Sequence, residues 1–209
     1  MTTLAALTDG STTWFGSDSQ SQMNGIRNRA PCRKWVQLGE LWIGTSGFYR
    51  AILEFESSGL KYENLSSAIT NESEARGFSL QVCRDLRDAL ANQEWNMEPD
   101  GPGPKSIGCS FCLAAAGWVW SVDSGLSPVL VQSEELCTNG SGWEIALGAG
   151  STALSFNLPP REAVRVALEQ AIYWDTGSGG SIFLYELTKA GVLEEVLPPS
   201  STVAKGGLK

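Results

Sequence analysis

The sequence predicts an α+β protein in which two antiparallel sheets pack face to face and helices cover both outer surfaces, a four-layer αββα sandwich. The turns between successive predicted strands are only two or three residues long, and such turns join antiparallel strands. Several strands are apolar on both faces, which is typical of strands that are covered on both sides. The predicted order of strands, helices, strands, helix and strand fits these layers.

The first half of the chain is predicted to contain two hairpins followed by helices. Strands are expected over residues 2–7 and 12–15, joined across the turn dipeptide Asp9-Gly10, and residues 17–29 read as a loop. A second hairpin joins residues 34–38 to 41–45. Helices are expected over 48–55 and 72–91, with a weakly helical segment over 57–73. The helix over 72–91 rests on the four-residue spacing of Phe78, Val82, Leu86 and Leu90.

The second half is predicted to return to strands after a loop over residues 96–106 that is rich in proline and glycine. Strands are expected over 109–116, 118–122, 128–132, 143–147 and 181–186, and an amphipathic helix over 159–174. We expect one domain over residues 1–188, followed by a C-terminal extension over 189–209 whose polar end is partly disordered.

Composition excludes several classes of function. The net charge is −8 with few Lys and Arg residues, which argues against nucleic acid as a partner. No apolar run is long enough to span a membrane, and a signal-peptide pattern is lacking. The five cysteines are odd in number and irregularly spaced, which suits a reduced chain, so we expect a cytoplasmic protein. The chain has no histidine, so any hydrolytic base must be a carboxylate, a lysine or a terminal amine.

Thr2 is the first candidate for catalysis. If Met1 is removed, the α-amine of Thr2 has a pKa near neutrality and can serve as the base for its own hydroxyl. Taken singly, Thr2 and the other candidates have ordinary explanations. Asp18 fits a turn residue, Lys34 a solvated charge, and the segment from Asp175 to Gly180 a helix end followed by a turn.

Together these segments resemble the proteasome-type β subunits, which are N-terminal-nucleophile hydrolases. Within this family, the sequence most resembles bacterial homologues without a long propeptide, such as the HslV peptidase and the β-proteobacterial proteasome homologue. The resemblance covers residues 2–187. It rests on five segments: Thr2-Thr3-Leu4, Gly16-Ser17-Asp18-Ser19-Gln20, Lys34 before the strand over 35–38, Ser46-Gly47, and Asp175 with Ser178-Gly179-Gly180.

The sequence departs from the family pattern at one expected position. The family has a Gly-Ser-Gly segment after the strand that we place over residues 143–147. Here that strand is followed by Gly148-Ala149-Gly150, so alanine stands where the family has a serine that helps to hold the terminal amine, and Ser151 follows.

The resemblance implies a threonine-type endopeptidase in which Thr2 attacks the peptide carbonyl. It implies that Lys34, ion-paired to Asp18, assists proton removal, and that Asp175 and Ser178 position the Thr2 amine. The Gly47 amide would donate to the oxyanion. The substrate would bind as an extended strand between the segment Gln20-Ser21-Gln22 and the turn Ser46-Gly47.

The resemblance also implies a self-assembled complex of stacked homo-oligomeric rings that cleaves peptides or unfolded proteins without a cofactor. An ATP-dependent unfoldase is an optional partner. Two alternatives stay open. One is a catalytically impaired shell or scaffold subunit, suggested by Ala149. The other is a small-molecule amidase on the same nucleophile.

The cysteines and tryptophans are expected to be structural. Cys109 and Cys112 have the spacing of a zinc or redox pair, but Cys83 and Cys137 are isolated in the sequence and histidine is lacking, so we expect no metal. In a strand, residues three apart point to opposite faces. The tryptophans in predicted strands are expected in the core or at subunit interfaces, namely Trp35, Trp42, Trp118, Trp120 and Trp143.

Overall fold

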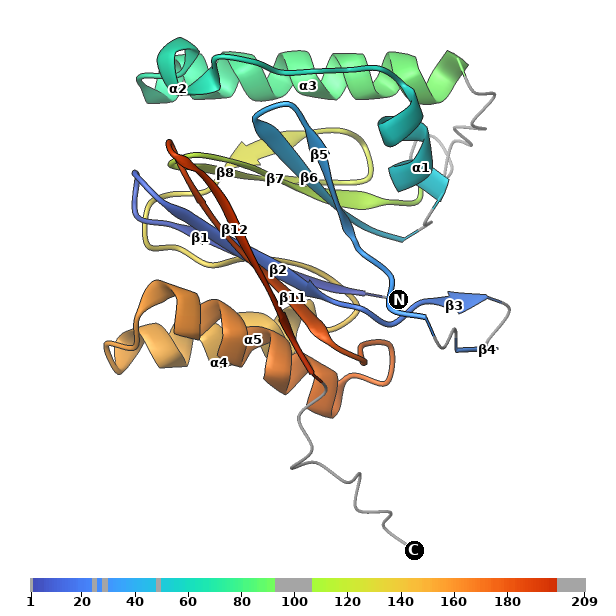
Figure 1. Ribbon diagram of the computed structural model, residues 1–209, viewed down its shortest axis with the longest axis vertical. Helices are drawn as coiled ribbons and strands as arrows, with labels where there is room; N and C mark the ends of the chain where they lie inside the picture. Colours follow the sequence, from blue (N-terminus) through green and yellow to red (C-terminus); the bar gives the residue numbers. More distant parts are fainter. Residues whose placement is uncertain (1, 24–25, 28–29, 48–49, 93–106, 199–209) are drawn as a thin grey trace, which may run out of the picture.

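The computed structural model describes residues 2–23, 26–27, 30–47, 50–92 and 107–198, and it confirms the four-layer architecture. Two five-stranded sheets lie face to face, and helices cover the outer surface of each (Figure 1). The strand pairs within both sheets are antiparallel, as the short turns predict. In these ranges, helices that could cross a membrane are absent.

The first sheet contains the chain's beginning and end. Its strand order is β10-β1-β2-β11-β12, with bounds Cys137–Gly140, Thr3–Thr8, Thr13–Asp18, Ile182–Thr188 and Gly191–Leu197. The β1–β2 hairpin forms at the predicted turn, where Asp9 Oδ1 accepts hydrogen bonds from the amides of Ser11 and Thr12. All six residues of β1 are buried, so this strand lies at the centre of the molecule.

The second sheet has the strand order β5-β6-β7-β8-β9, with bounds Trp35–Leu38, Leu41–Ser46, Ser110–Ala115, Trp118–Val122 and Pro128–Leu130. A separate two-stranded ribbon of β3 (Gln22–Met23) and β4 (Ile26–Arg27) extends from the loop after β2. Its backbone lies beside the start of the chain (Figure 1).

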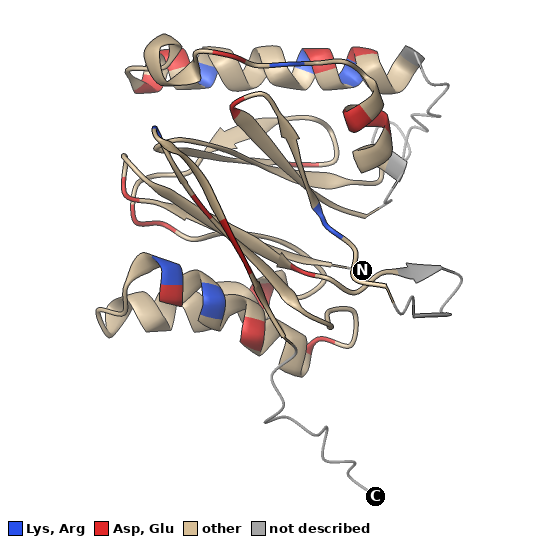
Figure 2. Ribbon diagram, viewed as in Figure 1, with Lys and Arg blue, Asp and Glu red and all other residues tan. Residues whose placement is uncertain are grey.

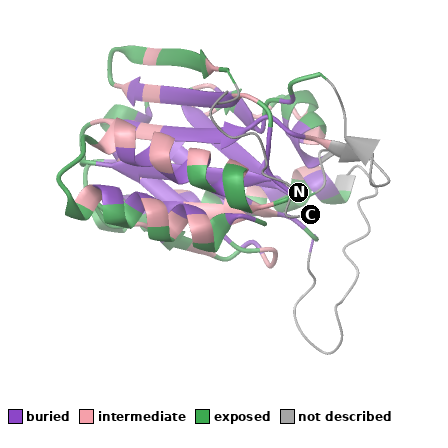
Figure 3. Ribbon diagram, turned by 90° about the horizontal axis from the view of Figure 1, so that it is seen from below, coloured by how far each residue is buried: buried purple, intermediate pink, exposed green. Residues whose placement is uncertain are grey.

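Helices α1 (Arg50–Ser57), α2 (Leu65–Ala68) and α3 (Glu72–Asn92) cover the second sheet, and α4 (Trp143–Ser155) and α5 (Pro160–Trp174) cover the first. Val82, Leu86 and Leu90 of α3 are buried, which confirms the predicted inward face. Buried residues fill the middle of the molecule, and exposed ones lie on the outer helices (Figure 3). Charged residues lie mainly on the helices, β12 and the turns (Figure 2).

Aromatic side chains pack between the two sheets. Phe15 lies 4.5 Å from Trp35, 5.4 Å from Trp42 and 5.0 Å from Tyr185, measured between ring centroids. A side chain at Gly44 would collide with the Trp35 ring, so glycine is required for this packing. The prediction that the tryptophans of the strands are buried is therefore confirmed for Trp35, Trp42 and Trp120, while Trp118 is partly buried.

Residues 143–147 are helical, so the predicted strand there is wrong. They begin α4, which continues through Gly148-Ala149-Gly150, and Trp143 is 45% exposed on this helix. Ala146, Gly150 and Ala153 are buried along one helix face at helical spacing. A Cβ atom at Gly150 would lie 3.1 Å from Cβ of Ala167 on α5. The small residues thus serve close packing of α4 on α5 rather than a loop.

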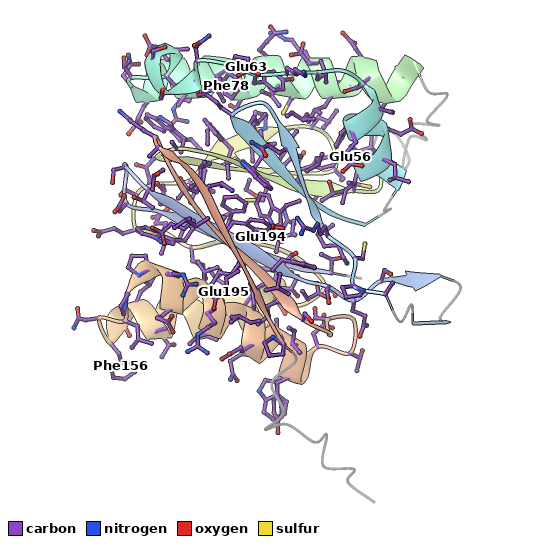
Figure 4. All side chains as sticks on the ribbon, viewed as in Figure 1. Glu56, Glu63, Phe78, Phe156, Glu194 and Glu195 are labelled. Atoms are coloured by element: carbon purple, nitrogen blue, oxygen red, sulfur yellow. The ribbon has the colours of Figure 1, made fainter. Side chains whose placement is uncertain are left out.

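Residues beyond 188 add a strand to the first sheet. β12 pairs with β11 along its full length, from Gly191 opposite Thr188 to Leu197 opposite Ile182. Glu194 and Glu195 of β12 form ion pairs with Arg33 and Arg161, respectively (Figure 4). The part of the predicted extension that the structure describes is therefore ordered on the sheet, while residues 199–209 lie outside the described residues.

The five cysteines are buried. Cys109 packs between the second sheet and its helices, and Cys112 packs between the two sheets, as opposite faces of one strand predict. Cys137, which is isolated in the sequence, lies with its Sγ 3.6 Å from Sγ of Cys112. The pairing of β10 with β1 brings Cys137 to this inter-sheet layer. Among the described residues, groups of three metal-ligating side chains are absent.

Candidate active site at Thr2

Thr2 lies directly before β1, and its hydroxyl contacts a buried lysine. The Lys34 ammonium donates hydrogen bonds to Thr2 Oγ1 and to the carbonyl oxygen of Gln20, each at 2.6 Å. Thr2 is 3% exposed and Lys34 is 4% exposed. Lys34 directly precedes β5 of the second sheet, whereas Thr2 enters the first sheet. The packing of the two sheets therefore brings these two residues together.

Asp18, at the end of β2, holds the backbone around Thr2. Its Oδ1 accepts from the Thr3 amide at 2.9 Å, and its Oδ2 accepts from the Gln20 and Gly179 amides at 3.0 and 3.1 Å. Burial raises the pKa of the Asp18 carboxyl, an effect that the Lys34 charge and these amide bonds counter.

The expected ion pair between Lys34 and Asp18 is absent, although the structure describes both residues. Backbone amides occupy both carboxylate oxygens of Asp18, and Lys34 instead contacts Thr2 and Gln20. The charge of Lys34 still acts on the Asp18 carboxyl through space. Asp18 thus fixes the chain beside Thr2, and the ammonium remains directed at the hydroxyl.

A second carboxylate, in the loop after α5, is connected to the start of the chain through two serines. Asp175 Oδ2 accepts hydrogen bonds from the hydroxyls of Ser178 at 2.8 Å and Ser141 at 2.6 Å. Burial alone would raise the pKa of the Asp175 carboxyl, but hydrogen bonds from Ser141, Gly177 and Ser178 more than offset that effect, and the pKa lies below its ordinary value. Ser178 Oγ also lies 2.6 Å from Thr3 Oγ1, which connects Asp175 to the start of β1.

Ser141 is a residue of this cluster that was not predicted from the sequence. Its amide donates to the Thr2 carbonyl oxygen at 2.8 Å, and its hydroxyl lies 3.5 Å from the same oxygen. It belongs to a Gly140-Ser141-Gly142 segment that begins at the last residue of β10. A side chain at Gly140 would collide with the Thr2 carbonyl, and one at Gly142 with Thr3 Oγ1.

The expectation that Ala149 replaces the serine of the family's Gly-Ser-Gly segment is therefore wrong. Gly148-Ala149-Gly150 lies within α4, and the Gly-Ser-Gly segment of this chain occurs earlier, at 140–142. The Gly140-Ser141-Gly142 segment is visible in the sequence. It can be recognised as the family segment only when residues 137–140 are known to form a strand. Ala149 consequently gives no reason to expect an incomplete site.

Gly47 and Ser46 lie on the other side of Thr2, at the end of β6. Gly47 has φ +116°, a conformation that favours glycine, and an added Cβ would lie 2.7 Å from the Gly108 carbonyl oxygen. Thr2, Ser46 and Gly47 together line one cavity of about 680 Å³. The expected oxyanion turn therefore adjoins the candidate nucleophile.

The expected substrate-binding segment is only partly open to a ligand. The Gln20 side chain is buried and donates to the carbonyl oxygens of Thr176 and Gly177, so it supports the Asp175 loop. Ser21 is half-buried beside it. The side chain of Gln22 and residue Met1 lie outside the described part of the chain.

No protein-family model and no curated protein matches this sequence. The fold nevertheless matches solved structures of BPH, a bacterial proteasome homologue, from Thiobacillus denitrificans. For BPH in complex with epoxomicin the TM-score is 0.70 at 15% identity, covering 89% of this chain and 98% of that chain. A second BPH structure gives 0.71 at 16% identity, covering 89% of this chain and 97% of that chain.

This chain has the fold of a proteasome-type β subunit. The likeness extends over nearly the whole of BPH, so the proteasome-type fold includes both sheets and both helical layers. At this level of identity the comparison establishes the fold alone. The chemistry of the Thr2 cluster is therefore argued from this chain's own residues.

Proposed function

We propose that this proteasome-type protein is an N-terminal threonine endopeptidase that hydrolyses peptide bonds once Thr2 is the first residue. The observation that carries the proposal is the 2.6 Å hydrogen bond from the buried Lys34 ammonium to Thr2 Oγ1. A threonine hydroxyl is a weak nucleophile, and a cation at this distance stabilises the negative charge that develops on its oxygen during attack.

The chemistry uses the groups around Thr2 in sequence. The free Thr2 amine takes the proton from Oγ1 as this oxygen attacks the carbonyl carbon, and it then gives that proton to the leaving amine. The product is an acyl ester on Thr2, which water hydrolyses. Asp175, Ser178 and Ser141 form the hydrogen-bonded group that positions the amine. The Gly47 amide donates to the oxyanion of the tetrahedral intermediate.

The substrate class follows from the site's position between two sheets. The segment around Ser21 and the turn at Ser46-Gly47 offer backbone groups on either side of Thr2, and an extended peptide pairs with such edges. Peptides and unfolded protein segments present an extended backbone, whereas folded proteins do not. No cofactor takes part in the proposed reaction, and an ATP-dependent unfoldase is the kind of partner that would supply unfolded substrate.

We also propose that the chain assembles into stacked rings, which would confine cleavage to an interior. Large apolar side chains are exposed on the α4–α5 layer, where Phe156 is 74% exposed and Trp174 is 66% exposed. Phe156 projects away from the end of this layer (Figure 4). Exposed large apolar side chains that lie next to one another, such as Tyr173 and Trp174 with ring centroids 4.5 Å apart, are typical of contact surfaces. Native mass spectrometry of the wild type and of Phe156→Asp tests assembly, and a monomeric wild type would contradict it.

The alternative of an impaired shell subunit loses its one supporting observation, because Ala149 lies within α4 and Ser141 is present beside Thr2. Cleavage of a fluorogenic peptide separates the remaining alternatives. We expect Thr2→Ala to abolish cleavage and Thr2→Ser to retain much of it, since serine keeps the nucleophilic hydroxyl. Cleavage by Thr2→Ala at the wild-type rate would refute the role of Thr2. Cleavage of short acyl amides without cleavage of peptides would favour an amidase.

A further inference from the structure

The cavity beside Thr2 follows the end of the second sheet from Ser46 of β6, past Ser110 of β7, to Asp123 after β8. At one end it is lined by Thr2, Ser46 and Gly47, and at the other by the β8–β9 turn around Asp123. Among the described residues, Ser21 and Lys34 do not line it. A peptide whose acyl side lies between Ser21 and Gly47 would therefore continue past Thr2 into this cavity with its leaving-group side.

One wall of the cavity is a closed hydrogen-bond network with little capacity left for a ligand. Ser46 Oγ lies 2.8 Å from Ser110 Oγ, and Ser110 Oγ donates to Asn139 Oδ1 at 2.7 Å. Asn139 also donates to the Phe111 carbonyl oxygen and accepts from the Gly140 amide. This network connects β6 and β7 of one sheet to β10 of the other, so it fixes the shape of the cavity.

The end of the neighbouring strand β8 carries the cavity's charge. Asp123 is the only charged side chain among the described residues that line it. Asp123 Oδ1 accepts from the Gly125 and Ser127 amides, each at 2.9 Å, which fixes the turn. Its Oδ2 forms no hydrogen bond or ion pair with the described residues. The neighbouring Ser121 and Ser124 contribute hydroxyls to the same end of the cavity.

Apolar side chains also line the cavity. The half-exposed Trp143 contributes apolar surface, and the buried Cys109 and Val122 line the cavity together with the polar residues. A cavity with apolar sides and one carboxylate suits a side chain with a long hydrocarbon stem and a positive end, which describes lysine and arginine. A carboxylate-bearing side chain would instead meet the like charge of Asp123.

We propose that this cavity binds a lysine or arginine side chain on the leaving-group side of the cleaved bond, with Asp123 as the specificity-determining residue. The inference rests on the proposed peptidase function, because that function places the leaving group beyond Thr2. Asp123 is exposed, so its attraction for a cation is screened by solvent and salt. We expect a preference of about three- to fivefold for lysine over norleucine at low salt.

Cleavage of peptide series tests the preference. The peptides carry lysine, norleucine or glutamate at the first and second positions after the cleaved bond, and kcat/KM is measured for wild type, Asp123→Asn and Asp9→Asn. Asparagine keeps the Oδ1 acceptor that both turns use, so both variants retain their turns. Asp123→Asn should remove the lysine-to-norleucine preference, and Asp9→Asn should not. An equal preference in wild type and Asp123→Asn would overturn the inference.

Binding to Thr2→Ala separates this inference from the peptidase proposal. Fluorescence anisotropy with a labelled lysine-containing peptide and its norleucine counterpart is compared between Thr2→Ala and Thr2→Ala/Asp123→Asn. If wild type cleaves no peptide but the lysine peptide still binds more tightly in an Asp123-dependent way, the peptidase proposal fails and the cation site stands. If Asp123 affects neither cleavage nor binding, the cation site fails.

Discussion

The hydroxyl of Ser141 donates a 2.6 Å hydrogen bond to Oδ2 of Asp175, while the amide of the same serine donates to the Thr2 carbonyl oxygen at 2.8 Å. Ser141, in the loop after β10, therefore links Thr2 at the beginning of the chain to Asp175 in the loop after α5. The carboxylate of Asp175 depends on this serine and on Ser178 for its position.

We expect Ser141→Ala to lower kcat by about 10- to 100-fold, because small displacements of a positioned catalytic group have effects of this size. The fold should be retained, since Ser141 is exposed and its amide bond to Thr2 does not need the side chain. Ala149→Ser is the matched control, because residue 149 lies in α4 away from the cluster. Restoration of activity to Ser141→Ala by Ala149→Ser would contradict this assignment.

The pKa of Asp175 predicts a pH dependence of stability. Its folded-state pKa lies below the ordinary value of 3.8, so the folded state binds a proton less readily than the unfolded state. This contribution to stability is present above the unfolded-state pKa and is lost as the pH falls through the lower, folded-state pKa. The difference in unfolding free energy between wild type and Asp175→Asn should thus shrink below about pH 4. Urea unfolding across acidic pH measures it, and a difference independent of pH would contradict the prediction.

Asp18→Asn should destabilise the fold by about 1–3 kcal/mol, because an amide nitrogen would face a backbone N–H group in a buried site. Asp18 accepts through both carboxylate oxygens, and asparagine has only one acceptor oxygen. Asp9→Asn is the control, since Asp9 accepts its turn bonds through Oδ1 alone and is exposed. Chemical denaturation compares the two variants. Equal losses of stability would contradict the prediction that the buried hydrogen bonds to Asp18 contribute more than the exposed ones to Asp9.

Gly47→Ala should reduce both stability and catalysis. The positive φ of Gly47 and the nearby Gly108 carbonyl leave no space for a methyl group, and such strain costs about 1–3 kcal/mol. Displacing an oxyanion donor costs on the order of 100-fold in kcat. Gly148→Ala is the control: a Cβ there meets nothing within 4 Å, and alanine should stabilise α4 by about 0.5–1 kcal/mol. Thermal unfolding and peptide cleavage together test both changes.

Local patterns predicted the four layers, and the resemblance to proteasome-type β subunits predicted most of the Thr2 cluster. The β1–β2 hairpin follows from Asp9-Gly10, and the inward face of α3 follows from the spacing of its apolar residues. Thr2, Lys34 and Asp175 were found through a motif pattern, and the fold brings them close together. Their proximity depends on sheet packing, which connects residues far apart in the chain.

The errors have physical causes that no local pattern reveals. β10 is short and polar, so residues 137–140 show no strand periodicity, and Ser141 went unnoticed after them. The glycines of α4 suggested a loop, yet Gly150 permits close contact with α5. Lys34 and Asp18 were expected to pair as opposite charges, but backbone amides occupy the Asp18 carboxylate instead.

The most direct test of a nucleophilic Thr2 is the intact mass of the purified protein before and after treatment with a peptide epoxyketone. We predict a mass that lacks Met1, a single probe adduct on wild type, and no adduct on Thr2→Ala. Retention of Met1 in a preparation that cleaves peptides, or an equal adduct on Thr2→Ala, would contradict the proposal that Thr2 is the nucleophile.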